Sequence, residues 1–405
     1  MRVVLNQHAA FGPRTGIGHY TSQLLSCLHQ LTEPGEIDAR PGAWLNGLRH
    51  LLARQGRPAA PSPGTVPRRR KGLKARAAAL LRPCGRALLR LYFRRVFRGG
   101  RYDLYHEPNF IPVPCDLPTV ATVHDLSVLL HPEWHPADRV AYFEKHFHQG
   151  LGQCVHYFAI SESARIEISK VLNIPLERIT RTYMGIRPGL RPLPESEVAP
   201  VRRELGLPDD YLLYLGTVEP RKNVLTLLRA YCDLPAPLRE RCPLVLAGGW
   251  GWRTEEVAAY YDAHAQHRGV LHLGYVPERC VPALYNGARA LVFPSLYEGF
   301  GLPPVEMLAC GGAVLASTAA AVAETAGPRA HLTEPHDLQG WRDALYRVIT
   351  DDDWRDQLRR DVVEFARPFT WQRCAEGTLR VYRALCGAGS LVESVPVTQP
   401  IRRAG

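Results

Sequence analysis

The sequence lacks several features that would place the chain in a specialised class. No stretch of about 18 uncharged apolar residues occurs, so no membrane-spanning helix is predicted. No secretory leader is predicted, because Met1 and Arg2 run directly into a strand pattern. The ten cysteines form no C-x-x-C pair, and several lie in apolar runs, which predicts reduced, buried thiols and no zinc site. These absences favour a cytoplasmic location.

Acidic residues are missing from one long segment. Between Ala39 and Tyr102 there is no Asp or Glu but there are 17 Lys and Arg, whereas the remaining chain holds 33 basic and 39 acidic residues. The net charge of +11 therefore arises in this segment. Within residues 72–101, arginines recur every four residues among leucines and aromatics, at Arg82, Arg86, Arg90, Arg94 and Arg98.

A helix with this pattern carries a basic stripe beside apolar side chains, which suits an anionic membrane surface. A solvated outer helix packed on its own domain is the alternative. A nucleic-acid-binding role is less well supported, because the arginines alternate with aliphatic residues and no recognisable RNA or DNA module is present. We therefore expect peripheral attachment through residues 72–101 and no nucleic-acid partner.

The length and composition predict two α/β domains. A chain of 405 residues with 46% apolar and 22% charged residues can bury two cores. Apolar strand patterns alternate with helical patterns in both halves, which is typical of parallel, doubly wound sheets. We expect a first domain over 1–190 with a basic insert over 39–102, and a second over 191–365. The proline-rich segment 187–200 is the predicted linker.

The most informative motif is SLYEGFGLPPVEMLACGG, at residues 295–312. It follows an apolar strand pattern and precedes a short helix that we expect to begin at Pro303 and to end at the Gly311–Gly312 pair. The N–H groups at such a helix start favour an anion. In this chain they belong to Gly299, Phe300, Gly301 and Leu302.

Two carboxylates, Glu298 and Glu306, flank these donors. Ionised carboxylates only accept hydrogen bonds, so they repel a phosphate but bind sugar hydroxyls well. A nucleotide sugar carries hydroxyls at both ends and a diphosphate between them, which matches this spacing. A surface helix with two ordinary glutamates is the alternative.

This corner resembles the E-x7-E motif of the retaining glycosyltransferases of family 4, which have the GT-B fold. The resemblance implies two Rossmann-like domains facing across a cleft, with a helix over 366–387 that crosses back to the first domain and leaves a tail over 388–405. It also implies that Glu298 lies by the donor sugar and that Glu306 binds the ribose.

A basic turn follows another predicted strand. Ligands of open parallel sheets bind beyond the carboxyl ends of the strands, so Arg221 and Lys222 of EPRKN lie at the productive edge. We expect both to hold the diphosphate, as the resemblance also implies, with Lys222 the more important because Thr217 replaces the usual arginine of the family. A solvated turn is the alternative.

Two segments of the first domain complete the predicted site. Gly16 and Gly18, in RTGIGHY, allow the backbone to approach a ligand closely. His124 ends an apolar strand and can donate a hydrogen bond to a sugar hydroxyl or to an oxygen that gains charge. The resemblance places His124 near the anomeric centre, and a histidine satisfied at the sheet edge is the alternative.

The resemblance implies transfer of a hexose from a nucleotide diphosphate sugar to a glycan or lipid-linked acceptor. HDLSVLLHPEWHP and EPRKN are similar to segments of bacterial mannosyltransferases of surface-polysaccharide synthesis, which favours GDP-mannose. Basic residues and helix dipoles can stabilise a leaving diphosphate, so we expect transfer without a metal ion or another cofactor. A nucleotide-sugar epimerase and a phosphorylase remain as alternatives. The expected location is the inner face of the plasma membrane.

Overall fold

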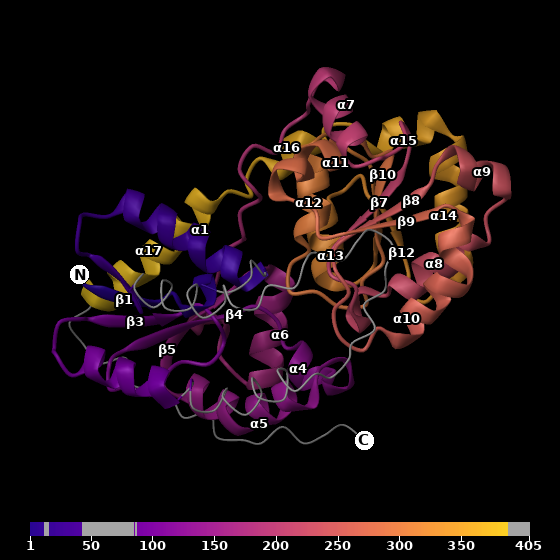
Figure 1. The fold of residues 1–405 in the computed structure, drawn as a ribbon. Helices are drawn as coiled ribbons and strands as arrows, with labels where there is room; N and C mark the ends of the chain where they lie inside the picture. Colours follow the sequence, from indigo (N-terminus) through magenta and orange to yellow (C-terminus); the bar gives the residue numbers. More distant parts are fainter. Residues whose placement is uncertain (12–15, 43–84, 86, 388–405) are drawn as a thin grey trace.

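The computed structural model describes residues 1–11, 16–42, 85 and 87–387. They form two domains, each built on a parallel six-stranded sheet with helices on its faces (Figure 1). The predicted fold class, α/β with two doubly wound domains, is therefore confirmed. The predicted tail over 388–405 lies outside the described residues.

The first domain contains the strands β1 (Val3–Asn6), β2 (Ile37–Arg40), β3 (Leu104–Glu107), β4 (Thr119–Val123), β5 (Cys154–Ala159) and β6 (Ile179–Arg181). Its helices include α1 (Gly16–Leu31), α4 (Ser127–Leu130), α5 (Ala137–Gly152) and α6 (Glu162–Leu172). The strand order is β2-β1-β3-β4-β5-β6. The inner strands are apolar and buried because helices cover both faces of the sheet.

The second domain contains β7 (Leu212–Leu215), β8 (Leu244–Ala247), β9 (Val270–Gly274), β10 (Ala290–Phe293), β11 (Val314–Ser317) and β12 (His331–Thr333). Its helices include α7 (Glu195–Glu204), α8 (Val224–Cys232), α10 (Glu255–Tyr260), α11 (Val281–Gly287), α12 (Leu302–Ala309), α13 (Ala320–Ala326), α14 (Leu338–Thr350), α15 (Asp352–Leu358) and α16 (Val362–Ala366). The strand order is β12-β11-β10-β7-β8-β9, so β7 and β10 are neighbours. The turns that follow these two strands meet at one edge of the sheet.

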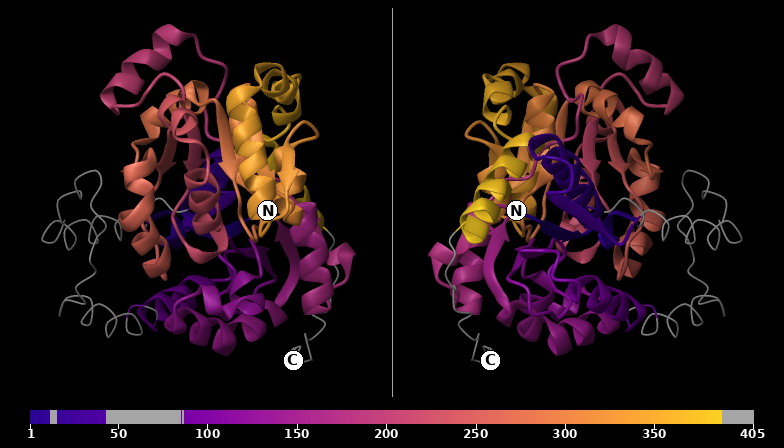
Figure 2. Two further views of the ribbon diagram at one scale, coloured as in Figure 1. Left: turned by 90° about the vertical axis from the view of Figure 1, so that its right-hand side faces the viewer. Right: turned by 90° about the vertical axis from the view of Figure 1, so that its left-hand side faces the viewer.

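The chain crosses between the domains twice. It leaves the first domain after β6, and it returns through the last helix, α17 (Trp371–Gly387), which packs beside α1 (Figures 1 and 2). The two crossing segments contact each other, since the N–H of Ile186 donates to the carbonyl of Phe369 at 3.1 Å. A Cβ at Gly185 would lie 2.3 Å from the backbone nitrogen of Trp371, so glycine is needed for this approach.

Several boundaries differ from the sequence-based expectation. The short edge strands β2, β6 and β12 were not predicted. The proline-rich segment 187–200 is not linker throughout, because α7 begins at Glu195 and tolerates Pro200 inside the helix. Helix α12 begins at Leu302, one residue before the expected Pro303. No described helix is long and apolar enough to cross a membrane.

Part of the basic insert is helical. Residues 87–97 form a helix whose Phe93 is fully buried against Val4 and Tyr105 of the first sheet. On its outer side, Leu88 and Leu91 are 67% and 52% exposed, and Arg94 is exposed beside them. The inner side of this helix thus packs on the first domain, as the alternative of an outer helix predicted. Arg82 and Arg86 lie outside the described residues.

A buried carboxylate, Glu107, lies at the carboxyl end of β3. Its Oε2 accepts hydrogen bonds from Asn6 Nδ2 at 2.6 Å and from Tyr105 OH at 2.7 Å, and its Oε1 accepts from the N–H of Asn109 at 3.0 Å. Burial raises the pKa of Glu107 from an ordinary value of 4.5 to about 7, and these three donors oppose the rise only in part.

We expect Glu107 to make the stability of the protein depend on pH. A carboxyl with a raised pKa stabilises the folded state fully below pH 4.5, and this contribution is lost as the pH rises through 7. The free energy of unfolding of Glu107→Gln minus that of the wild type should therefore increase by up to about 3 kcal/mol as the pH rises. Denaturant titrations from pH 5 to 8 measure this difference. The same slope in a Glu177→Gln control, at an exposed position, would contradict the assignment.

Candidate active site

The loop between β10 and α12 forms a tight corner where the two domains meet. Gly301, before the first turn of α12, has φ +100°, a left-handed conformation that favours glycine. A Cβ at Gly299 would lie 1.9 Å from the carbonyl oxygen of His124 in the first domain. The glycines of the motif are therefore required by backbone conformation and by close contact between the domains.

The carbonyl groups of this corner are held by hydroxyl groups. Ser161 Oγ donates to the carbonyl of Gly299 at 2.6 Å, and Thr325 Oγ1 donates to that of Phe300 at 2.9 Å. The ring of Phe300 is buried in the core, so it contributes packing rather than contact with a ligand. Helix-start N–H groups have no partner within their helix, so those of Gly301 and Leu302 are available to an anion.

Glu298 lies between the two cations of the turn that follows β7. Arg221 Nη1 donates to its Oε2 at 2.7 Å, and Lys222 Nζ donates to its Oε1. Ser295 Oγ also donates to Oε1, at 2.9 Å. Arg221 Nε donates in addition to Glu219 Oε1 at 2.6 Å. The two carboxylates and the two cations form a charge cluster that is neutral overall.

Two members of this charge cluster, Arg221 and Glu298, have pKa values shifted by their surroundings, and their side chains are 20% and 7% exposed. Burial opposes the charge of Glu298, yet Arg221 and Lys222 outweigh it and hold the pKa of Glu298 below its ordinary value. Burial likewise opposes the charge of Arg221, and the carboxylates of Glu298 and Glu219 raise its pKa instead. Arg221 therefore presents a positive charge, with Lys222 beside it, at the sheet edge predicted to bind the diphosphate.

Glu306 lies on α12, one turn further into the second domain, and its environment differs from that of Glu298. It is 1% exposed. Tyr285 OH donates to its Oε2 at 2.8 Å, and Arg187 Nη1 lies 3.2 Å from the same oxygen. Burial raises the pKa of Glu306, although Arg187 and Tyr285 oppose the rise. The two glutamates of the motif thus have pKa shifts of opposite sign.

His124 lies at the end of β4, in contact with the corner. It is 5% exposed, and its ring packs edge-on against Tyr20 of α1, with 4.9 Å between ring centroids. Its Nε2 lies 2.8 Å from the carbonyl of Pro108, which requires the proton on that nitrogen. Burial lowers the pKa of His124, so the ring is neutral. The expected donor group is thus engaged within the protein, and Nδ1 can only accept.

The glycines of the first domain lie nearby. Gly16 is the first residue of α1, and Gly18 is buried in its first turn, two residues before the Tyr20 that packs on His124. A Cβ at Gly16 would meet nothing within 4 Å, and its φ is not left-handed, so no protein contact requires glycine there. Residues 12–15, the rest of this loop, lie outside the described residues.

Hydrogen bonds across the cleft hold the domains together beside the charge cluster. Glu324 of α13 accepts from the N–H groups of Glu162 and Ser163 at the start of α6, each at 2.8 Å. Tyr297, next to Glu298, accepts from the N–H of Leu126 at 2.9 Å and donates to Glu167. The corner after β10 is therefore held against the first domain, where Gly299 lies next to the backbone of His124.

Sequence reasoning missed three residues that shape the site. Glu219 was part of EPRKN, but its pairing with Arg221 could be inferred only from their common turn. Tyr285 and Arg187 reach Glu306 from α11 and from the crossing segment, and no local pattern connects these residues in sequence. Trp252 donates from Nε1 to the carbonyl of Trp134 across the domains, at 2.7 Å.

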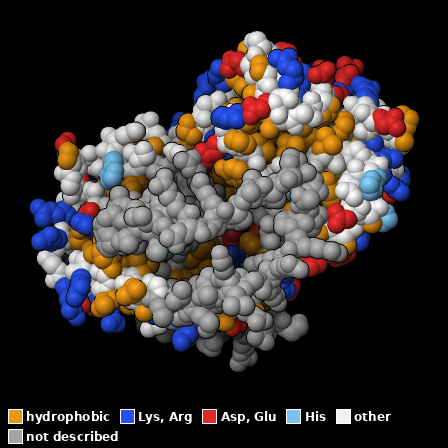
Figure 3. All heavy atoms as spheres, in the orientation of Figure 1, with side chains coloured by type: hydrophobic (Ala, Val, Ile, Leu, Met, Phe, Trp, Pro, Cys, Tyr) orange, Lys and Arg blue, Asp and Glu red, His pale blue; other side chains and the backbone are white. Residues whose placement is uncertain are grey.

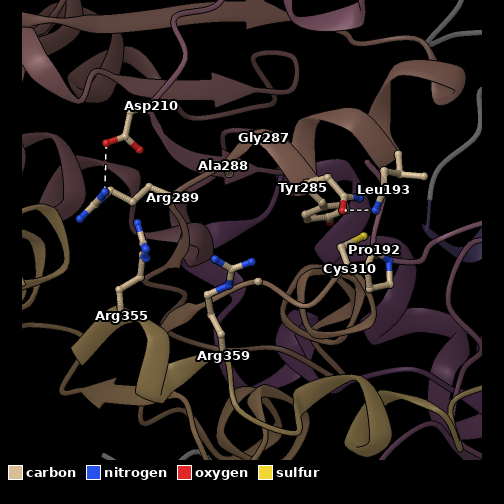
Figure 4. A pocket seen from close by; sticks show the side chains of 12 residues that line it. Pro192, Leu193, Asp210, Tyr285, Gly287, Ala288, Arg289, Cys310, Arg355 and Arg359 are labelled. Atoms are coloured by element: carbon tan, nitrogen blue, oxygen red, sulfur yellow. Dashed lines mark hydrogen bonds and ion pairs between the residues drawn. The ribbon is translucent and has the colours of Figure 1, made fainter. Parts of the chain in front are cut away.

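A polar hollow lies at the opposite edge of the second sheet, where β7, β10 and β11 begin (Figure 4). Arg289, Arg355 and Arg359 line it. Arg289 pairs with Asp210 at 3.1 Å, and the other two also bond to protein groups. Because ligands of parallel sheets bind at the carboxyl edge, this hollow is not the predicted site. The described residues contain no group of three or more His, Cys, Asp or Glu placed to hold a metal ion.

Comparison with known sequences agrees with the geometry. Residues 199–368 match the family described as "Glycosyl transferases group 1". The chain is 32% identical over 389 residues to the O-antigen chain mannosyltransferase B of Escherichia coli, and the match covers 95% of this chain and 100% of the relative.

Solved structures agree on the fold. Sucrose-phosphate synthase from Thermosynechococcus elongatus superposes with a TM-score of 0.71 at 19% identity, over 96% of this chain and 100% of the other. WaaG, a glycosyltransferase involved in lipopolysaccharide biosynthesis, superposes with a TM-score of 0.68 at 15% identity, over 96% of this chain and all of its own. The fold is the GT-B arrangement expected from the sequence.

Proposed function

Because this chain belongs to the group 1 glycosyl transferases, we propose that it moves mannose from GDP-mannose to a glycan or lipid-linked acceptor in the synthesis of a cell-surface polysaccharide. The full-length similarity to an O-antigen chain mannosyltransferase supports both the sugar and the pathway class. Membership of the family favours glycosyl transfer over the epimerase and phosphorylase alternatives. Retention of the anomeric configuration is part of the proposal, from the resemblance to family 4.

The observation that carries this proposal is the charge cluster of Arg221, Lys222, Glu219 and Glu298 beside the first turn of α12. The charge cluster is neutral overall, so an anion can bind there if Arg221 and Lys222 pair with it instead of with Glu298. The oxygens of the donor diphosphate would accept hydrogen bonds from Arg221 and Lys222 and from the N–H groups of Gly301 and Leu302. Glu298 would then be free to accept hydrogen bonds from hydroxyl groups of the transferred sugar.

This exchange suits the chemistry of the reaction. As the bond between sugar and phosphate breaks, negative charge grows on the departing diphosphate, and cations already aimed at that position stabilise the transition state. Contact between the domains at Gly299 and His124 excludes water from the reacting sugar. His124 Nδ1 can accept a hydrogen bond from a sugar hydroxyl there, whereas its Nε2–H donates to the carbonyl of Pro108.

We expect substitution of the charge cluster to remove activity without unfolding the protein. Glu298→Gln and Lys222→Ala should each lower turnover of GDP-mannose by about 10²-fold, because each removes one charge-stabilising contact. Release of GDP in the presence of an acceptor glycan measures turnover, and a panel of UDP-sugars tests the donor.

The control is Arg359→Gln, in the hollow at the opposite edge of the second sheet. It should leave turnover within about twofold of the wild type, since uncoupled surface changes have small effects. Wild-type turnover in Glu298→Gln would refute the role given to the charge cluster. Efficient use of a UDP-sugar with none of GDP-mannose would refute the donor assignment alone.

The proposed reaction needs no metal ion, because Arg221 and Lys222 supply the positive charge at the diphosphate. Activity of the purified enzyme should therefore remain within about twofold in excess chelator, without added Mg²⁺ or Mn²⁺. Turnover before and after chelation measures this. Loss of activity that returns on adding Mg²⁺ would show that a cation assists the leaving group.

We also propose that the enzyme binds the inner membrane surface through the basic insert. The exposed side of helix 87–97 combines Leu88 and Leu91 with Arg94 and Arg95, and the exposed Arg98 follows the helix. Figure 3 shows Lys and Arg side chains next to apolar ones at the lower left edge, where the described end of this insert lies. Such a surface inserts leucines between lipid headgroups while the arginines meet anionic charge.

The double substitution Arg94→Gln, Arg95→Gln should weaken binding to anionic vesicles by about 30-fold, since each arginine near the surface contributes about 1 kcal/mol. Cosedimentation with phosphatidylglycerol vesicles measures this. The matched control Arg342→Gln, Arg373→Gln removes two exposed arginines from other parts of the molecule and should bind like the wild type. Equal loss of vesicle binding in both double variants would show that the net charge of the protein, and not the basic insert, determines binding.

A further inference from the structure

A buried ion pair links the second glutamate of the motif to the segment that joins the domains. Glu306 is 1% exposed, and the Arg187 guanidinium lies 3.2 Å from its Oε2. The backbone N–H of Arg187 also donates to Oε1, at 3.4 Å. Both oxygens of Glu306 therefore contact one residue, which belongs to neither sheet.

This arrangement answers a physical problem. A carboxylate without water is costly to ionise unless a cation and hydrogen-bond donors compensate for its lost hydration. Tyr285 supplies a donor at 2.8 Å but no charge. Among the described residues, Arg187 is the cation that ion-pairs with Glu306. If Arg187 were absent, burial would favour the protonated form of Glu306.

The protonation state matters for sugar recognition. An ionised carboxylate has about four acceptor positions, and the protein's hydrogen bonds use one on Oε2 and one on Oε1. Oε1 thus keeps capacity for a hydroxyl donor. A protonated carboxyl would donate one hydrogen bond and accept less well, so it would match a ribose diol poorly.

Arg187 is itself fixed by the crossing segments. The residue before it, Ile186, donates its N–H to Phe369 at 3.1 Å, where the chain returns to the first domain. The Arg187 side chain is 29% exposed, and its Nη1 is buried without a hydrogen bond in spite of the ion pair. The Arg187 guanidinium thus compensates for the charge of Glu306 without using a hydrogen-bond acceptor position of the carboxylate.

We propose that Arg187 is a positioning residue for the nucleotide, which keeps Glu306 ionised and oriented to accept the ribose hydroxyls. The inference rests on the proposed function, because that function assigns the ribose to Glu306. It adds a residue outside both Rossmann-like sheets to the donor site. It also separates Arg187 from Arg191, four residues on, which is 57% exposed and pairs with Glu197 at 3.1 Å.

A thermodynamic cycle between protein and ligand tests this role. Binding of GDP, UDP and their 2′,3′-dideoxy counterparts is measured by calorimetry for the wild type, Arg187→Gln, Arg187→Met and Arg187→Lys. The wild type should bind the better ribonucleotide about tenfold more tightly than its dideoxy form. In the Gln and Met variants ribonucleotide affinity should fall about tenfold, and the dideoxy penalty should shrink below about threefold, because coupled groups are not additive.

The controls separate a positioning role from a structural one. Arg187→Lys keeps the charge and should restore most of the dideoxy penalty, whereas Arg191→Gln should match the wild type. A full dideoxy penalty in both Arg187→Gln and Arg187→Met, or an equal loss in Arg191→Gln, would overturn the inference and leave the proposed function intact. If the wild type bound neither nucleotide, or bound ribo and dideoxy forms equally, the donor site and the role of Arg187 would both be refuted.

Discussion

The pairing of Glu298 with Arg221 and Lys222 is the constraint on which the site depends. The carboxylate of Glu298 is only 7% exposed, so the two cations beside it compensate for the hydration that it loses. The pairing also joins the turn after β7 to the corner after β10, which are neighbours in the sheet. A ligand that competes for these cations therefore acts at the junction of two turns that the fold already holds in register.

The two glutamates of one motif are given different properties by their surroundings. Glu298 faces two cations in the cleft, and its pKa is lowered, whereas Glu306 is enclosed by α11 and the crossing segment, and its pKa is raised. Two glutamates with seven residues between them thus have different electrostatic environments. The difference arises from partners that lie far away in sequence, so the motif alone does not determine it.

Much of the architecture could be predicted because parallel strands buried on both faces are uniformly apolar, as in β8 and β10. The edge strands β2, β6 and β12 could not, since each has three or four residues and only one that is buried. The glutamates, the basic turn and the glycines of the corner could be selected as candidates because each lies within a short local motif. Arg187 was not, because RPGLR contains two arginines that only the three-dimensional packing distinguishes.

His124 illustrates how far a motif can carry a mechanism. Its position at the end of β4 and beside Gly299 matches the expectation, but its Nε2 proton is directed to the carbonyl of Pro108. A neutral histidine with that tautomer has only a lone pair to offer at Nδ1. In the proposed reaction, stabilisation of the departing charge would therefore come from the second domain, from Arg221, Lys222 and the start of α12. The first domain would contribute shape and the acceptor at Nδ1 of His124, and it contacts the corner through the backbone of His124 and the hydroxyl group of Ser161.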